Sequence, residues 1–232
     1  ETVLIPSLLS VSNKLGRLSI IWGDQKMMSK THGQPAVTTT MGKELMVFKS
    51  RLDIQLSKLR NIKYTSKFGG AVGNLNAHYI SYPDKPWDTI MDNFLERTFS
   101  IKRNRWTTQI DHYDNLSEVF DILRRINTVL IDLNQDMWLY ISNEYFKLKQ
   151  NKNETGSSTM PHKVNPINFE NAEGNIHMAN ALLTTFSQKL PVSRLQRDLT
   201  DSTISRNFGS AFSYCLISYN SLLKGLDKIT IN

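Results

Sequence analysis

The stretch HYDNLSEVFDILRRINTVLIDLNQDMWLYISNEYFKLK, residues 112–149, sets the fold class of this 232-residue chain. It contains no glycine or proline, and its apolar residues recur at steps of three and four, the period of a helix with one buried face. A periodic pattern longer than about 25 residues is typical of a coiled coil, a membrane helix or a long bundle helix. Six charged residues exclude the membrane: Glu118, Asp121, Arg124, Arg125, Asp132 and Asp136. The stretch therefore predicts a long helix that packs against several helical neighbours.

The same helical period continues on both sides of this stretch. It predicts helices over residues 3–28, 41–62, 87–99, 167–187 and 201–224, separated by polar connectors. The sequence shows no sustained heptad, no internal repeat and no β-rich segment. The predicted fold class is all-α, an elongated helical bundle.

Composition and charge narrow the class of protein. Hydrophobic residues make up 40% of the chain, which is enough for a core. The net charge of +7 favours an anionic partner, although ordinary solubility charge is the simpler explanation until specific residues show otherwise. No window of about 18 residues is free of charge, so we expect no membrane span. The single cysteine, Cys215, and the lack of a charged-then-apolar leader favour a reducing, cytoplasmic setting.

Two polar loops at helix ends carry candidate catalytic groups. In THGQPA, residues 31–36, His32 could transfer a proton near neutral pH, or it could simply cap a helix. In GSSTMPHKVNP, residues 156–166, Ser157 and Ser158 supply hydroxyls, Lys163 could lower the pKa of a hydroxyl or bind a carboxylate, and Asn165 adds two amide donors. A flexible serine-rich turn explains the same composition. Glu170 follows early in the next helix, where the helix dipole favours a carboxylate, and it could either orient a histidine or cap the helix.

A third loop, SRLQRDLTDSTISRNFG at residues 193–209, gathers arginines and hydroxyls. Arg197, Ser202 and Arg206 have the side chains of an anion clamp, because guanidinium forks and serine hydroxyls donate to phosphate or carboxylate oxygens. Salt bridges to Asp198 and Asp201 are the alternative. The cluster KRNRW at residues 102–106 could contact nucleic acid. No zinc-ligand spacing, nucleophile elbow or dinucleotide fingerprint is present in the sequence.

Taken together, these loops resemble a known family. GSSTMPHKVNPINFE resembles the signature loop of the fumarase/aspartase superfamily. THGQPA with TTTMGKE, KFGGAVGNLNAH, and LPVSRLQRDLTDSTISRNFG are similar to the adenylosuccinate lyase family within it. The resemblance implies that residues 1–232 form the central helical domain, with the family's N-terminal region and small C-terminal domain absent. It also implies a homotetrameric helical core whose active sites combine loops from different chains.

The resemblance further implies the chemistry. Members of the family eliminate fumarate from adenylosuccinate, giving AMP, and from the succinylated aminoimidazole carboxamide ribotide of purine biosynthesis. No metal or organic cofactor is expected, and neither nucleic acid nor a membrane is an expected partner. Carried over by motif, Ser157 is the expected catalytic base, His32 the general acid and Glu170 its carboxylate partner. The expected substrate-binding residues are Lys163, Asn165, Gln109, Asn171, Arg197, Ser202 and Arg206.

Two other functions stay open from the sequence. A lyase of the same superfamily could use a different amine leaving group, such as that of argininosuccinate, although the arginine-rich loop argues against it. A non-catalytic helical module could instead use its positive charge to bind nucleic acid, with steep salt dependence.

Overall fold

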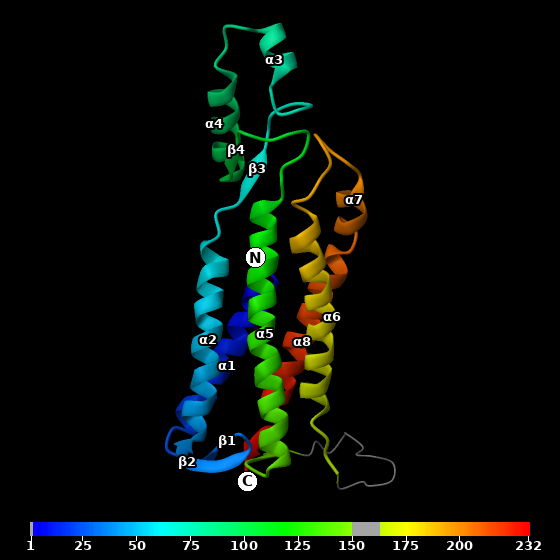
Figure 1. Cartoon of the computed structure of the whole chain (residues 1–232). Coiled ribbons are helices and arrows are strands. Elements are labelled where there is room, and N and C mark those ends of the chain that lie inside the picture. The colour runs from blue at the N-terminus through cyan, green and yellow to red at the C-terminus, as the bar shows by residue number, and fades with distance from the viewer. Residues whose placement is uncertain (1, 150–162) are drawn as a thin grey trace. The chain divides into compact units, whose positions relative to one another are not determined.

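A computed structural model describes residues 2–149 and 163–232, and most of them lie in helices (Figure 1). The chain divides into two compact units. The first unit consists of Glu1–Arg60, Arg124–Asn180 and Ser210–Asn232, and the second of Asn61–Leu123 and Ala181–Gly209.

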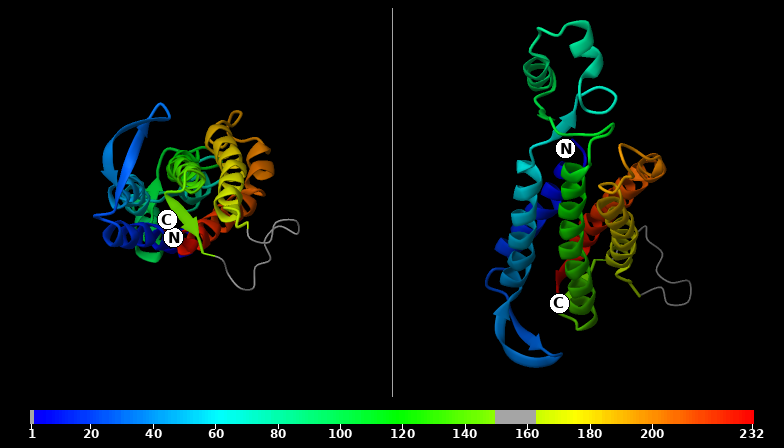
Figure 2. Two further views of the ribbon diagram at one scale, coloured as in Figure 1. Left: turned by 90° about the horizontal axis from the view of Figure 1, so that it is seen from below. Right: turned by 45° about the horizontal axis from the view of Figure 1, so that its top comes forward.

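Parts of five helices run side by side in the first unit. They are α1 (Leu4–Ile21), α2 (Met41–Asn61), α5 (Asp114–Ser142), α6 (Ile167–Lys189) and α8 (Phe208–Lys228) (Figures 1 and 2). Each buries an apolar stripe, and one fully buried residue from each helix is Leu8, Leu45, Leu130, Ile176 and Leu222. Each such aliphatic side chain contributes ~1.5–3 kcal/mol by leaving water. The predicted helical bundle is confirmed.

A polar seam inside this bundle ties three of the helices together. The Tyr219 hydroxyl of α8 donates to Asn127 Oδ1 of α5 at 2.7 Å, and Asn127 Nδ2 donates to Asn180 Oδ1 of α6 at 2.9 Å. Asn127 and Tyr219 are completely buried. A buried polar group without its partner costs ~1–3 kcal/mol, so this network favours one register of the three helices over any other.

The prediction of a purely all-α fold needs correction, because the described residues also form three two-stranded sheets. The largest is an antiparallel hairpin of β1 (Lys26–Thr31) and β2 (Gln34–Thr40), which includes the end of the segment predicted as helix 3–28. Helix α1 ends at Ile21. At Gly42 of α2, an added Cβ would lie 2.2 Å from the Ser19 carbonyl oxygen, so glycine lets the backbone of α2 approach the end of α1 closely.

The other two sheets are short. β3 (Thr65–Lys67) pairs in parallel with β4 (Lys102–Asn104), and β5 (Phe146–Leu148) pairs antiparallel with β6 (Ile229–Ile231). The pairing of β5 shows that the predicted helix over 112–149 was too long at its C-terminal end. α5 ends at Ser142, and Glu144 takes a left-handed φ of +61° that stops the helix.

The second unit contains the short helices α3 (Asn76–Ser81) and α7 (Thr200–Ser205), with α4 (Trp87–Phe99) between them in sequence. Three aromatic rings, Phe120, Phe186 and Phe208, pack in its core with centroids 4.9 to 5.3 Å apart. Helix α3 lies inside a segment predicted as loop. The helix predicted over 201–224 is two helices, α7 and α8, with Arg206 and Asn207 between them.

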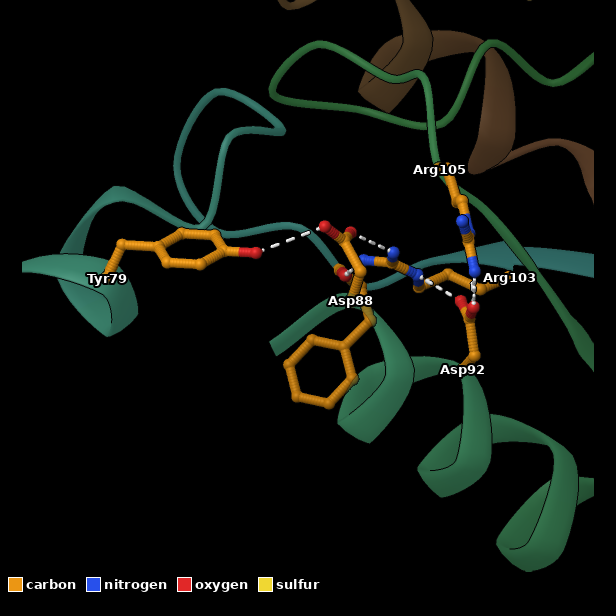
Figure 3. A network of polar contacts seen from close by, with 6 residues as sticks. Tyr79, Asp88, Asp92, Arg103 and Arg105 are labelled. Carbon is orange, nitrogen blue, oxygen red and sulfur yellow. Dashed lines mark hydrogen bonds and ion pairs between the residues drawn. The ribbon is translucent and has the colours of Figure 1, made fainter. Parts of the chain in front are cut away.

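A buried arginine fixes α4 to β4 in this unit. Arg103, whose side chain is 2% exposed, donates from Nε to Asp92 at 2.7 Å, from Nη1 to the Phe68 carbonyl at 3.0 Å, and from Nη2 to Asp88 (Figure 3). Arg105 also pairs with Asp92. These guanidinium groups lower the pKa of Asp88 and of Asp92. Two arginines of the KRNRW cluster are therefore neutralised internally, which weakens the nucleic-acid alternative.

None of the helices in the described ranges combines the length and the apolarity needed to cross a membrane.

Candidate active site

His32 lies at the tip of the β1–β2 hairpin. The two loop residues His32 and Gly33 both have positive φ, +54° and +75°, as a type I′ turn requires. Glycine accepts this conformation at little cost, and the histidine side chain is left exposed to solvent. Strand β1 of the hairpin is held to the turn after α5, since Tyr145 donates to the Met28 carbonyl at 2.9 Å and Lys30 to Asn143 at 2.6 Å. The hairpin thus presents an imidazole on a fixed arm.

Three of the predicted site residues share one pocket of the first unit. Lys163, Asn165 and Glu170 line a cavity of about 380 Å³ together with Trp138, Ile141, Ser142 and Pro166. Lys163 and Asn165 precede α6, and Glu170 lies in its first turn. The pocket therefore places one cation, one amide and one carboxylate around the same space, a set of groups that can bind and orient a carboxylate-bearing ligand.

Trp138 of α5 is a site residue that the sequence analysis missed. Its indole Nε1 donates to Glu170 Oε1 at 3.0 Å, and its side chain lines the same pocket. In the sequence, Trp138 follows Met137 within an apolar run and resembles a core residue. Its 41% exposure shows that it lies outside the buried stripe. A helical-wheel count would have placed it one step off the 130, 133 and 137 face, which is the signal that was available.

A second cavity of about 550 Å³ adjoins this pocket and shares Trp138 and Glu170 with it. Gln135 donates to Glu173 Oε1 at 2.8 Å there, and His177 lies 3.8 Å from the same oxygen. These residues occupy one face of α6 and the facing side of α5, so the pocket around Glu170 continues along a groove between the two helices.

The side chain of Asn171 forms hydrogen bonds to other residues of the first unit. Its Nδ2 donates to Ser221 Oγ at 3.1 Å, and its Oδ1 accepts from Asn175 at 3.1 Å. These bonds orient the amide against α8. A substrate contact by Asn171 stays a prediction.

The anion-binding candidates gather in the second unit. The backbone N–H of Gln109 donates to the Gln196 carbonyl at 3.2 Å, which places this predicted glutamine beside the residue that precedes Arg197. Gln109, Arg197 and Arg206 are all exposed. The structure therefore brings the segment WTTQ next to the arginine-rich loop, although the two lie far apart in the sequence.

The salt-bridge alternative holds for only one arginine of that loop. Arg194 Nη1 pairs with Asp198 at 2.9 Å, and Asp198 also accepts hydrogen bonds from Thr200. These bonds, those from Thr200 above all, lower the pKa of Asp198. Neither Arg197 nor Arg206 forms an ion pair with a described residue. Both remain available to an anionic ligand.

Ser202 sits beside a buried carboxylate. Asp201, 7% exposed, accepts the Ser202 N–H at 2.8 Å and the Tyr113 hydroxyl at 3.0 Å. From the sequence, Asp201 was expected only as a salt-bridge partner, and Tyr113 was not predicted as a site residue. Burial raises the pKa of the Tyr113 phenol, with the Asp201 hydrogen bond as a second cause, so the phenol stays a neutral donor.

The described residues do not test two of the sequence predictions, the role of Ser157 and the pairing of His32 with Glu170. Ser157 belongs to residues 150–162, which lie outside them. His32 and Glu170, predicted as an acid and its carboxylate partner, share no hydrogen bond within one chain, where Glu170 instead accepts from Trp138. Their pairing stays a prediction that needs a second chain.

The family described as Lyase matches residues 2–180, and the family described as Adenylosuccinate lyase C-terminal matches residues 193–232. The chain is 54% identical over 235 residues to an adenylosuccinate lyase of Dictyostelium discoideum, with 100% of this chain and 50% of the relative covered.

Bacterial relatives agree. Identity is 50% over 230 residues to the adenylosuccinate lyase of Legionella pneumophila strain Corby, covering 99% of this chain and 50% of the relative. It is 44% over 232 residues to that of Escherichia coli strain K12, covering 100% and 51%. The chain spans about half the length of these curated relatives. It belongs to the family described as Lyase.

Proposed function

We propose that this chain is the central part of an adenylosuccinate lyase. The reaction is a β-elimination that breaks the bond between a carbon of the succinyl group and the exocyclic nitrogen of the purine. The neighbouring carbon loses a proton, the electron pair of that C–H bond forms the double bond of fumarate, and the nitrogen takes up a proton to give AMP. The same elimination on the succinylated aminoimidazole carboxamide ribotide serves purine biosynthesis.

The observation that carries this proposal is the shared pocket of Lys163, Asn165 and Glu170, which directly follows the signature loop. Proton loss from the carbon next to a carboxylate builds negative charge on that carboxylate. A lysine ammonium and an asparagine amide aimed at one pocket stabilise such charge, and their effect grows when water is excluded. Ser157, six residues before Lys163, is assigned as the base, and His32 as the acid that protonates the leaving nitrogen.

The second unit supplies the affinity for the nucleotide in this proposal. Arg197 and Arg206 have no internal carboxylate partner among the described residues, and Ser202 lies between them in the sequence. Guanidinium groups bind phosphate with paired N–H donors. Gln109, held beside Gln196, and Asn171 complete the substrate contacts.

A homotetramer with shared sites fits the exposure of His32. A general acid at the tip of an exposed hairpin has little surrounding protein in its own chain, whereas catalysis requires a partly desolvated site. The helices of the first unit also leave large apolar side chains exposed, among them Met46, Ile54, Leu139, Met178 and Ile217. An exposed apolar helix face is typical of a subunit interface. We place the enzyme in the cytoplasm.

The test is the reaction itself. The full-length protein is mixed with adenylosuccinate, and AMP and fumarate are measured as they form. Ser157→Ala should abolish turnover while the helical circular dichroism signal is unchanged. Argininosuccinate is the matched substrate control and should not react. Cleavage of argininosuccinate in place of adenylosuccinate, or full activity of Ser157→Ala, would contradict the proposal.

A further inference from the structure

Two hydrogen bonds fasten the Gln109 segment to the arginine-rich loop of the second unit. One joins the Gln109 N–H to the Gln196 carbonyl at 3.2 Å, and the other joins the Tyr113 hydroxyl to Asp201 Oδ2 at 3.0 Å. The first involves only backbone atoms, so any residue other than proline could donate it. The second needs a phenol and a carboxylate, which are 88 residues apart in the sequence.

The Asp201 carboxylate serves both sides of this junction. Its Oδ2 accepts from Tyr113, while its Oδ1 accepts the Ser202 N–H at 2.8 Å and lies 3.5 Å from the Ser202 hydroxyl oxygen. Asp201 is only 7% exposed. A buried carboxylate with donors on both oxygens has a fixed orientation, so the position of Tyr113 is transmitted to the backbone that carries Ser202.

Tyr113 is itself fixed at the start of α5. Its backbone takes a left-handed φ of +61°, which favours glycine, and its carbonyl accepts the Ser117 N–H at 2.8 Å. A tyrosine held in this conformation aims its phenol from a rigid base. The positive charge of Arg197 opposes the rise in the pKa of the Tyr113 hydroxyl, so the guanidinium lies within electrostatic reach of the phenol.

We propose that Tyr113 and Asp201 are positioning residues that hold the Arg197, Ser202 and Arg206 segment in the conformation that binds the nucleotide phosphate. They touch no reacting atom. The inference rests on the proposed function for the identity of the anion. It adds a direction to that function, because loss of the junction should weaken the binding of the phosphate-bearing product and leave the dicarboxylate product unaffected.

The experiment compares product inhibition in the full-length enzyme and in Tyr113→Phe, which removes one oxygen and keeps the ring. The inhibition constant of AMP should rise about five- to tenfold, which corresponds to ~1–1.4 kcal/mol, the net contribution of a typical hydrogen bond. The inhibition constant of fumarate should not change. KM for adenylosuccinate should rise together with the inhibition constant of AMP, and kcat should stay within about twofold of the parent.

Tyr82→Phe is the matched control. Tyr82 belongs to the same unit, is 63% exposed, and its hydroxyl has no hydrogen bond to a described residue. Both inhibition constants should stay at their parental values in this variant. If Tyr113→Phe does not fold, Asp201→Asn replaces it, because asparagine keeps an acceptor oxygen and loses the charge. Asp201→Asn should raise the inhibition constant of AMP by a smaller factor and again leave the inhibition constant of fumarate unchanged.

An equal rise in the inhibition constants of AMP and fumarate would mean that the second unit is destabilised as a whole. An unchanged inhibition constant of AMP would mean that the Tyr113–Asp201 hydrogen bond does not position the arginine-rich loop. Either result overturns the inference. Failure of the proposed function is a separate result, since it appears as a parental enzyme that forms no AMP and fumarate. In that case AMP binding is measured by calorimetry, and the comparison between Tyr113→Phe and its parent still decides the inference.

Discussion

Glu170 is the carboxylate on which the pocket of the first unit converges. It accepts from Trp138 and faces the same cavity as Lys163 and Asn165. We expect Glu170→Gln to lower kcat by roughly 100-fold, the lower end of the range for a group that assists proton transfer. Glu173→Gln, one turn further along α6, is the control and should stay near the parental rate. Steady-state kinetics on adenylosuccinate provide the measurement, and equal losses in the two variants would contradict the role of Glu170.

The arginines of residues 193–209 should separate by their partners. Arg194 is already paired with Asp198, whereas Arg197 has no ion pair among the described residues. Arg197→Ala should therefore raise KM for adenylosuccinate at least tenfold, which corresponds to ~1.4 kcal/mol. Arg194→Ala should raise it less than about threefold, because an exposed pair contributes ~0–1 kcal/mol. A larger effect of Arg194 than of Arg197 would show that the assignment is reversed.

Among the structural elements, the β1–β2 hairpin has the most specific turn requirement. Gly33 has a φ of +75°, and a residue with a Cβ is strained there by ~1–2 kcal/mol. Gly33→Ala should displace His32 at the tip and lower kcat. The melting temperature should change little, since the hairpin tip contributes little buried surface. Gly209→Ala, where an added Cβ meets no atom within 4 Å, is the control. Calorimetry and kinetics on the same samples decide the point.

The arginine network of α4 and β4 predicts an acid-sensitive second unit. Arg103 and Arg105 lower the pKa of Asp88 and Asp92, so each carboxylate is more easily ionised in the folded than in the unfolded chain. Such a group adds stability that is fully present above the unfolded pKa of about 3.8 and is lost as the pH falls through the folded pKa. Arg103→Met should destabilise the protein at pH 7 by ~1–3 kcal/mol and flatten its acid dependence.

Arg105→Met is the control for that experiment. Its side chain is 56% exposed, so the loss should stay below ~1 kcal/mol. Urea unfolding at pH 7 and at pH 3 measures both variants. An unchanged slope of stability against pH in Arg103→Met would show that the network does not control acid stability.

The elements that sequence reasoning found and missed differ in how they bury their side chains. The helix around Leu130 and Met137 was found because a long apolar stripe repeats every three or four residues. The β1–β2 hairpin was missed because most of its residues are exposed, so no alternation of apolar and polar residues marks it. The break between α7 and α8 was missed because the two residues that separate these helices, Arg206 and Asn207, are neither glycine nor proline.

At the scale of the whole molecule, the sequence motifs predicted individual site residues, and the structure shows which of them lie close together. Lys163, Asn165 and Glu170 are close in the sequence, so their meeting in one pocket follows from one loop and one helix turn. The contact of Tyr113 with Asp201 could not be predicted, because the two are joined only by the folding of distant segments. Trp138 was hidden by its apolar character in a long apolar helix.

We propose that loops from different chains form one lyase site, with His32 and Ser157 supplied by separate subunits. The direct test of this shared site mixes two inactive full-length variants, His32→Gln and Ser157→Ala, after dissociation and reassembly. Some sites of the mixed oligomer then receive both intact residues, and adenylosuccinate cleavage should return to about a quarter of the parental rate for random mixing in a tetramer. Mixed samples that stay as inactive as either variant alone would contradict the claim.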